Sequence, residues 1–253
     1  SDASFIPTRQ NYVYSGFLGG SFPDEAGFYV GQNATEDAVI MYYLKDRVVT
    51  GDVRVEVYDQ SGKIIQSIAG TKRKGINKVT WDMRLKPPKV AKAVRPDQSG
   101  FTAPYVPEGT YTIKLIKGDK TIETAMELKI HPDCVHSRND IALQQETSLR
   151  MYKMQEDLAY MVENIGKVQG ETSKMIKDSK VSDKTGNSLI DKLEEIRKTL
   201  VSTKEGIITG EERLRERLGW LYVMITWYNG RPTDQQVAKI GDLQYELDEV
   251  QKK

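Results

Sequence analysis

The chain has 253 residues, of which 38% are hydrophobic and 29% charged, which is the balance of a globular protein with one or two domains. Its 37 basic and 36 acidic residues leave a net charge of +1, so it lacks the basic excess that favours binding to nucleic acid or to an anionic membrane. No apolar stretch approaches the roughly 20 residues of a membrane helix. The single cysteine, Cys134, excludes an internal disulfide.

The first half of the chain is expected to form strands, because its short runs alternate apolar and polar residues or are apolar throughout. The clearest alternation places Val53, Val55 and Val57 on one face. Asp37–Leu44 is apolar on both faces, as in a central strand. The expected strands are 11–14, 27–30, 37–44, 53–58, 63–68, 75–82, 107–115 and 121–130.

Turn residues separate these runs. Asp59–Gly62 is expected to be a turn whose glycine supplies a positive φ, and Gly118-Asp119 a two-residue hairpin. The proline-rich segment Lys86–Pro107 has no clear period and is expected to be a long loop, either a binding loop or an insertion that wraps the edge of the strand domain. Trp81 is expected in the core. Seven or eight short strands predict an immunoglobulin-like antiparallel β-sandwich over residues 1–132.

After residue 132 the apolar period changes to that of amphipathic helices. Ser137 is a suitable N-cap, and Asp140 favours the start of a first, long helix with a coiled-coil-like seam. Its apolar stripe is Met151, Met154, Leu158, Met161, Ile165, Val168, Thr172 and Met175. Ser188 with Asp191 is expected to begin a second helix. The stripe of this second helix is Leu189, Leu193, Ile196, Leu200, Thr203 and Ile207.

Two further helices complete the second half. The third is expected to stop at Asn229-Gly230, and Thr233 with Gln236 forms a capping box that opens the last. Their apolar stripes are Leu214, Leu218, Leu221 and Ile225, and then Val237, Ile240, Leu243, Leu247 and Val250. Short polar connections favour an antiparallel bundle of three or four helices over residues 133–253. The sequence therefore predicts an α+β protein, with a β-sandwich followed by a helical bundle.

Several motifs occur in a familiar order: Gly31-Gln32-Asn33, Ala38–Leu44, Val57–Gly62, Gly75–Arg84, Pro107–Tyr111 and Arg231–Gln236. These motifs resemble the C-terminal region of large secreted Bacteroidetes proteins, which carry an N-terminal β-propeller of BNR or sortilin-like repeats and are often labelled glycosyl hydrolases. The resemblance implies a sandwich similar to the immunoglobulin-like domain of flagellar hook-capping proteins, followed by terminal helices. The chain departs from the family at Ala34-Thr35, where the family usually has two prolines.

The propeller itself is missing from this sequence. A propeller would repeat every 40 to 50 residues or so, and a BNR repeat carries an Asp-box of the form Ser-x-Asp-x-Gly-x-x-Trp. Asp59–Gly62 is the nearest approach, and it lacks the flanking serine and the tryptophan. We therefore expect any activity that the family label implies to belong to the propeller.

A cluster at the junction between the two halves could supply zinc ligands. His131, Asp133, Cys134 and His136 lie within six residues, and the chain has no other histidine. A structural zinc site normally draws on two separated ligand pairs, so we interpret the cluster as a linker with incidental polar residues. Cys134 as a catalytic nucleophile is disfavoured, because neither histidine has an evident orienting partner.

The third helix is rich in aromatic residues: Trp220, Tyr222, Trp227 and Tyr228. They could form a platform for a sugar or a partner protein, or they could pack where the helices meet the sandwich. We take packing as the interpretation, since aromatic clusters on helices more often belong to the core.

No residue is assigned a catalytic, cofactor-binding or metal-binding role, because no spacing in the sequence nominates one. The leading hypothesis is a non-catalytic accessory or interaction module of the bacterial envelope or of secreted proteins, which docks onto a propeller or an outer-membrane complex. Ser1–Ser4 has neither the basic start nor the apolar core of a signal peptide, so the envelope location follows from the resemblance alone. The rival hypothesis is a glycoside-hydrolase-related enzyme or a carbohydrate-binding module, in which loops contribute two carboxylates.

Overall fold

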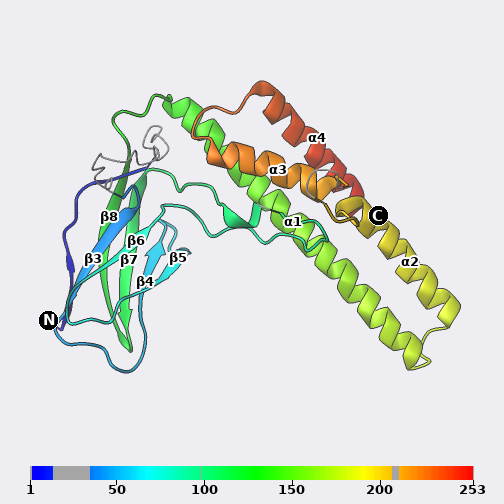
Figure 1. The fold of residues 1–253 in the computed structure, drawn as a ribbon, viewed down its shortest axis with the longest axis horizontal. Helices are drawn as coiled ribbons and strands as arrows, with labels where there is room; N and C mark the ends of the chain where they lie inside the picture. Colours follow the sequence, from blue (N-terminus) through cyan, green and yellow to red (C-terminus); the bar gives the residue numbers. More distant parts are fainter. Residues whose placement is uncertain (1, 14–34, 98, 207–210, 253) are drawn as a thin grey trace, which may run out of the picture. The chain divides into compact units, whose positions relative to one another are not determined.

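The computed structural model describes residues 2–13, 35–97, 99–206 and 211–252 (Figure 1). This part of the chain contains a three-stranded sheet, a five-stranded sheet, four α-helices and a short 3-10 helix, η1 (Ser99–Phe101). The α+β class expected from the change of period is confirmed. The chain divides into two compact units. We call them the strand unit (Ser1–Lys86 and Tyr105–Ser137) and the helical unit (Pro87–Pro104 and Arg138–Lys253).

The strand unit holds both sheets. The smaller has the order β1-β3-β6 and is antiparallel, with β1 at Ala3–Ile6, β3 at Ala38–Leu44 and β6 at Gly75–Trp81. The larger has the order β2-β8-β7-β4-β5, with β2 at Asn11–Val13, β4 at Val53–Tyr58, β5 at Ile64–Ala69, β7 at Gly109–Lys117 and β8 at Lys120–Ile130. β1 and β2 are consecutive in the chain but join different sheets. β1 pairs antiparallel with β3, whereas β2 pairs parallel with β8.

Alternation placed most of these strands correctly. Val53, Val55 and Val57 are all buried on β4, as their spacing requires. Gly62 takes a φ of 78° in the turn between β4 and β5, and Gly118 takes 55° in the hairpin between β7 and β8. β1 was not expected, and the strand expected at 27–30 lies outside the described residues. β3 buries one face only, because the residues between its buried positions are partly or fully exposed.

The core of the strand unit surrounds Trp81, which is 1% exposed. Its indole Nε1 donates to the carbonyl oxygen of Arg84 at 3.1 Å, and its ring meets the ring of Tyr111 edge to face at 5.6 Å. The hydroxyl of Tyr111 donates to the carbonyl oxygen of Pro107 at 2.7 Å. Both aromatic residues therefore satisfy their polar atoms while their rings are buried, which is what burial of such side chains requires.

The helical unit contains α1 (Arg138–Lys177), α2 (Asp183–Leu200), α3 (Leu214–Trp227) and α4 (Asp234–Gln251). The expected capping box of α4 is confirmed, because Thr233 and Gln236 exchange side-chain to backbone hydrogen bonds. The expected start of α2 at Ser188 is wrong. Ser182 caps that helix by accepting from the Thr185 N–H at 3.3 Å, so α2 begins earlier.

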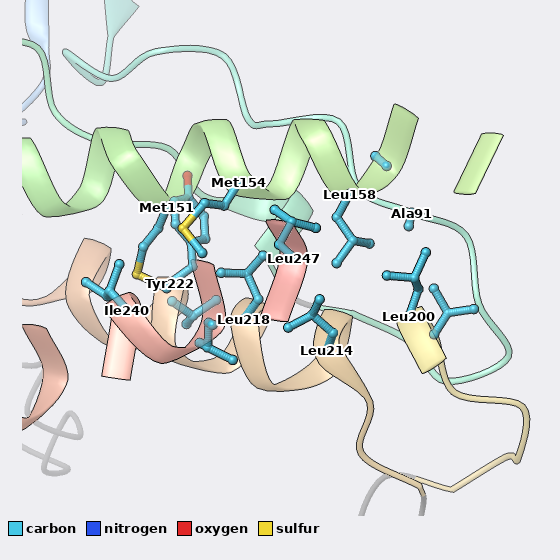
Figure 2. Packing of buried hydrophobic residues seen from close by; sticks show 14 of the residues in the cluster. Ala91, Met151, Met154, Leu158, Leu200, Leu214, Leu218, Tyr222, Ile240 and Leu247 are labelled. Carbon is cyan, nitrogen blue, oxygen red and sulfur yellow. The ribbon is translucent and has the colours of Figure 1, made fainter. Parts of the chain in front are cut away.

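The long helix α1 packs against different helices along its length (Figure 1). Near its start Gln144 donates to the Ile225 carbonyl of α3 at 2.9 Å, and further along Gln169 donates to the Ile190 carbonyl of α2 at 3.3 Å. α4 packs against both α1 and α3. A single apolar cluster fills the space between these helices, and Figure 2 shows Met154, Leu218 and Leu247 pointing into it from three of them.

The apolar stripe of α1 is not buried throughout. Met151, Met154 and Leu158 are fully buried, whereas Val168 and Met175, towards the end of the helix, are 40% and 47% exposed. Among the described elements, α2 is the helix that lies beside this end of α1 (Figure 1), and two packed helices cover less surface than three. Of the stripe expected on α2, Thr203 lies beyond the end of the helix and Ile207 lies outside the described residues.

Most of the segment Lys86–Pro107, which was expected to be a long loop, belongs to the helical unit: Pro87–Pro104 lie in it, whereas Lys86 and residues 105–107 belong to the strand unit. We call residues 87–97 and 99–104 the strap. Ala91 of the strap lies within the apolar cluster of the helices (Figure 2). The Lys89 N–H donates to Glu156 of α1 at 3.4 Å, and the Tyr222 hydroxyl of α3 donates to the Thr102 carbonyl at 3.1 Å. The expectation that this segment could wrap the edge of the strand domain is therefore corrected, because its contacts are with helices.

No helix in the described ranges combines the length and the apolarity that a membrane span needs.

Candidate interaction surface on helix α3

Helix α3 carries apolar side chains on two faces, and only one of these faces is buried. The buried face includes Leu214, Leu218, Tyr222 and Ile225, and it points into the apolar cluster. The second face consists of Trp220, Met224 and Trp227, whose i, i+4, i+7 spacing aligns them along one side of the helix. We call these three residues, with the adjoining Tyr228, the aromatic stripe.

The aromatic stripe is open to solvent. Trp220 is 65% exposed, Met224 48%, Trp227 61% and Tyr228 56%. The interpretation of these aromatic residues as packing is therefore wrong for Trp220, Trp227 and Tyr228. It holds for Tyr222, which is fully buried. Helical spacing distinguishes the two outcomes, since Tyr222 falls on the same face as Leu218 and Trp220 does not.

Ion pairs hold the surroundings of the stripe in place. The guanidinium of Arg217 pairs with the carboxylate of Glu246 on α4, and this hydrogen bond lowers the pKa of Glu246 below its ordinary value. Before the helix, the Thr203 N–H donates to Glu211 at 2.8 Å; this bond, with the Arg213 guanidinium, lowers the pKa of Glu211 to about 2. The first two turns of α3 are therefore linked to α4 through Arg217, and the residues before the helix are linked to Thr203 through Glu211.

A cleft of about 310 Å³ adjoins Trp220. Its lining comes from the strap and from the first turns of α3: Arg95, Pro96, Asp97, Glu212, Glu216, Gly219, Trp220 and Val223. The cleft therefore places an aromatic ring beside several carboxylates and one guanidinium. Arg95 lies 3.7 Å from Glu212 across it, so part of this charge is already paired.

Beneath the cleft lies a buried cluster of charges around Arg215, whose side chain is only 4% exposed. Its Nη1 lies 2.7 Å from Oε1 of Glu216 and donates to the Arg95 carbonyl at 2.9 Å. Its Nε lies 3.4 Å from Oδ2 of Asp97, without the geometry of a hydrogen bond. Glu216 also accepts from the Arg213 N–H at 3.0 Å, which caps the helix. The strap is therefore joined to α3 by a buried guanidinium that lies between two carboxylates.

The arrangement limits the chemistry of these carboxylates. Arg215 and backbone N–H groups already engage Asp97 and Glu216, because the Ser99 N–H donates to Asp97 at 2.7 Å. A general acid or a nucleophile needs a carboxylate that faces substrate and is able to change its protonation or form a bond. The feature of this part of α3 that remains open to a binding partner is the row of rings in the aromatic stripe.

The strand unit has a cleft of its own, of about 380 Å³. It lies between the connection from β1 to β2, the middle of β3 and residues 124–127 of β8. Gln10 reaches across and donates to the Glu127 carbonyl at 3.0 Å. Among the described residues, the charged side chains that line it are Arg9 and Glu127.

The junction cluster does not converge on a point. His131 Nδ1 accepts from the Asp133 N–H at 3.2 Å, and the histidine ring packs edge to face on Tyr12 at 5.2 Å. The Cys134 thiol lies 4.0 Å from the His136 carbonyl oxygen. Among the described residues, no group of three or more His, Cys, Asp or Glu side chains is placed to hold a metal ion.

Sequence reasoning missed the residues that join the strap to α3. Asp97 stands among prolines in a segment without periodicity, and its partner Arg215 is more than a hundred positions away. One available signal was Arg215 itself, a charged residue that helical spacing places beside Tyr222 at the edge of the apolar face of α3. A second was Gly219 in the interior of a helix, where glycine is unfavourable unless something approaches closely.

Comparison with known proteins adds no relative. No protein-family model matches the chain, and no curated protein or solved structure is significantly similar to it.

Proposed function

We propose that the protein is a non-catalytic interaction module that binds a protein partner through the aromatic stripe of α3. The observation that carries the proposal is the exposure of two tryptophans and a methionine along one side of α3, with the exposed Tyr228 directly after the helix. Large apolar side chains that are exposed together on one surface often mark a protein interaction site. Tryptophan, tyrosine and methionine are also enriched where partner proteins meet.

The order of the strands supports a finer proposal for the strand unit, an immunoglobulin-like sandwich. A first segment that divides between the two sheets, as β1 and β2 do, fits that fold. Tyr111 near the start of β7, with its hydroxyl bonded to the Pro107 carbonyl, corresponds to the tyrosine corner of such domains. For the helical unit we propose an antiparallel bundle, in which α1, α3 and α4 share one apolar core.

The proposed partner is a propeller domain or an outer-membrane complex of a bacterial envelope. This part of the proposal rests on the motifs that resemble the C-terminal region of propeller proteins. It places the protein in the periplasm, at the cell surface or among secreted proteins.

The test is photo-cross-linking from the stripe. A photoreactive amino acid replaces Met224, at the centre of the stripe, and the labelled protein is irradiated with envelope fractions of its native cells. We expect one dominant cross-linked protein, identified by mass spectrometry, because a specific interface presents one partner to one position. The matched control replaces Tyr245, which is 66% exposed on α4.

The outcome distinguishes the alternatives. Cross-linking at position 224 and none to the same protein at position 245 supports the proposal. Equal yields at both positions indicate non-specific contact, and no cross-link at position 224 contradicts it. Cross-links only to a second copy of the chain would make the stripe a self-association surface and overturn the accessory role.

One observation favours a second candidate function, carbohydrate binding. The cleft beside Trp220 combines an indole ring with the exposed carboxylate of Glu212, and such rings stack on sugars while carboxylates accept their hydroxyl hydrogens. Titration with envelope polysaccharides, followed by tryptophan fluorescence, tests this candidate. Saturable quenching that Trp220→Ala removes would support it. Turnover of a glycoside that Glu212→Gln removes would instead indicate an enzyme.

A further inference from the structure

The strap crosses the helical unit, yet it contributes little apolar surface to it. Its buried residues are prolines or have small or polar side chains: Pro88, Ala91, Ser99, Thr102, Ala103 and Pro104. The large side chains of the apolar cluster all come from the helices. Because hydrophobic stabilisation follows the apolar area removed from water, the helices hold one another together more strongly than they hold the strap.

Charged groups attach the strap to the helices near its start and in its middle. Lys89 pairs with Glu163 of α1, and its ammonium lies 4.5 Å from the centre of the Tyr160 ring. Further along, Asp97 meets Arg215 of α3. Gly219 permits this contact, since a Cβ atom at that position would lie 2.9 Å from both carboxylate oxygens of Asp97. The glycine inside α3 is therefore explained by the close approach of the strap.

The charges on the helix side stay compensated without the strap. Arg215 keeps its 2.7 Å contact with Glu216 on the same helix, and Glu216 keeps the Arg213 N–H. Asp97 would move into water. Removing one partner of a buried ion pair is costly because a charge is left alone, and detachment of the strap avoids that cost.

Some buried polar atoms where the strap meets α3 have no hydrogen-bond partner in the described part of the chain. Asp97 Oδ2, Ser99 Oγ and Arg215 Nε are buried and make no hydrogen bond among the described residues. Water would satisfy these atoms once the strap detached, which favours opening. Three features therefore lower the free energy needed to open the strap. The strap buries little apolar surface, the charges on the helix stay paired without it, and buried atoms at the contact lack hydrogen bonds within the described ranges.

We propose that the strap is a releasable latch, which detaches from α1 and α3 while the helices stay folded. Detachment removes the Asp97 wall of the cleft beside Trp220, so it would remodel the surface next to the aromatic stripe. The latch is independent of the proposed partner, since it follows from contacts within the helical unit alone.

The experiment measures thiol labelling in the native full-length chain with Cys134→Ser as background. Ala91→Cys and Ala103→Cys report on the strap, and Ala159→Cys on α1 is the matched control, because all three alanines are buried. Under native conditions we expect both strap thiols to be labelled at least about a hundredfold faster than the α1 thiol. Low concentrations of denaturant should raise the labelling rate of the α1 thiol only. Labelling of that thiol requires unfolding that exposes much surface, whereas local opening of the strap exposes little.

Two further changes test the fastening itself. Asp97→Asn weakens the pairing with Arg215, and Gly219→Ala displaces the carboxylate while improving helix propensity. Each should accelerate strap labelling about tenfold and leave the α1 thiol unchanged. Equal labelling rates and equal denaturant dependence at strap and helix would overturn the proposal, because the strap would then open only when the unit unfolds. Failure of one strap variant to fold leaves the other to decide.

Discussion

The two units treat their tryptophans in opposite ways. The strand unit encloses Trp81 and satisfies its indole N–H, whereas the helical unit leaves Trp220 and Trp227 largely in solvent. Where a strand has one buried face, every large apolar ring must lie on that face, and the alternation of the sequence determines which residues do so. Helix α3 carries apolar residues on more of its circumference than its neighbours cover. The uncovered face of α3 is the candidate interaction surface, and the covered face belongs to the core.

The largest effect on stability is expected at Trp81. Trp81→Ala removes a fully buried ring, its contact with Tyr111 and its bond to the Arg84 carbonyl. It should lower the free energy of unfolding by about 4 kcal/mol, measured by urea denaturation. A loss below about 1 kcal/mol would mean that the ring is not part of a packed core.

Arg215 should behave like a core residue of the helical unit in spite of its charge. Arg215→Ala leaves Glu216 buried on the same helix without its guanidinium, which should cost about 3 kcal/mol. The control is Arg213→Ala, because its side chain is 43% exposed and such a change stays within about 0.5 kcal/mol. Equal effects of the two variants in denaturant melts would remove the contrast between a buried and a surface arginine.

Tyr111 offers a smaller and pH-dependent test in the strand unit. Tyr111→Phe removes the hydrogen bond to the Pro107 carbonyl and should cost about 1 kcal/mol at neutral pH. Burial, with a smaller contribution from the charge of Asp59, raises the pKa of Tyr111 to about 12. The unfolded chain ionises first, near the ordinary tyrosine value.

The stability contributed by Tyr111 is therefore fully present below pH 10 or so, and is lost as the pH rises towards its folded pKa. Melting temperatures measured across this range should fall, and Tyr111→Phe should flatten part of the fall. An unchanged profile in the variant would show that other groups cause the alkaline loss.

The smallest effect on stability is expected at the aromatic stripe. Trp220→Ala with Trp227→Ala should change the free energy of unfolding by less than about 1 kcal/mol in total, since both side chains are mostly exposed. Thermal melts of the double variant check this directly. A loss comparable to that of Trp81→Ala would mean that the two tryptophans pack in solution.

Much of the fold could be predicted from local pattern. The β4 valines and the Thr233–Gln236 capping box follow from rules that act within a few residues, and both occur as expected. The start of α2 was misplaced because Ser182 and Ser188 both offer a hydroxyl cap, and sequence alone does not decide which is used. The strap could not be predicted, because contacts such as Tyr222 to Thr102 join residues far apart in the chain. The aromatic residues of the stripe could be recognised in the sequence. Their exposure could not be predicted, because it depends on which elements cover α3.

The central claim is that the aromatic stripe of α3 binds a partner protein. The most direct measurement is the dissociation constant between the full chain and the protein recovered by cross-linking, by isothermal titration calorimetry. We expect Trp220→Ala with Trp227→Ala to weaken binding by a factor of about thirty or more, as loss of two central aromatic contacts does. Tyr245→Ala should leave the constant within about twofold. An unchanged dissociation constant in a folded stripe variant would contradict the account.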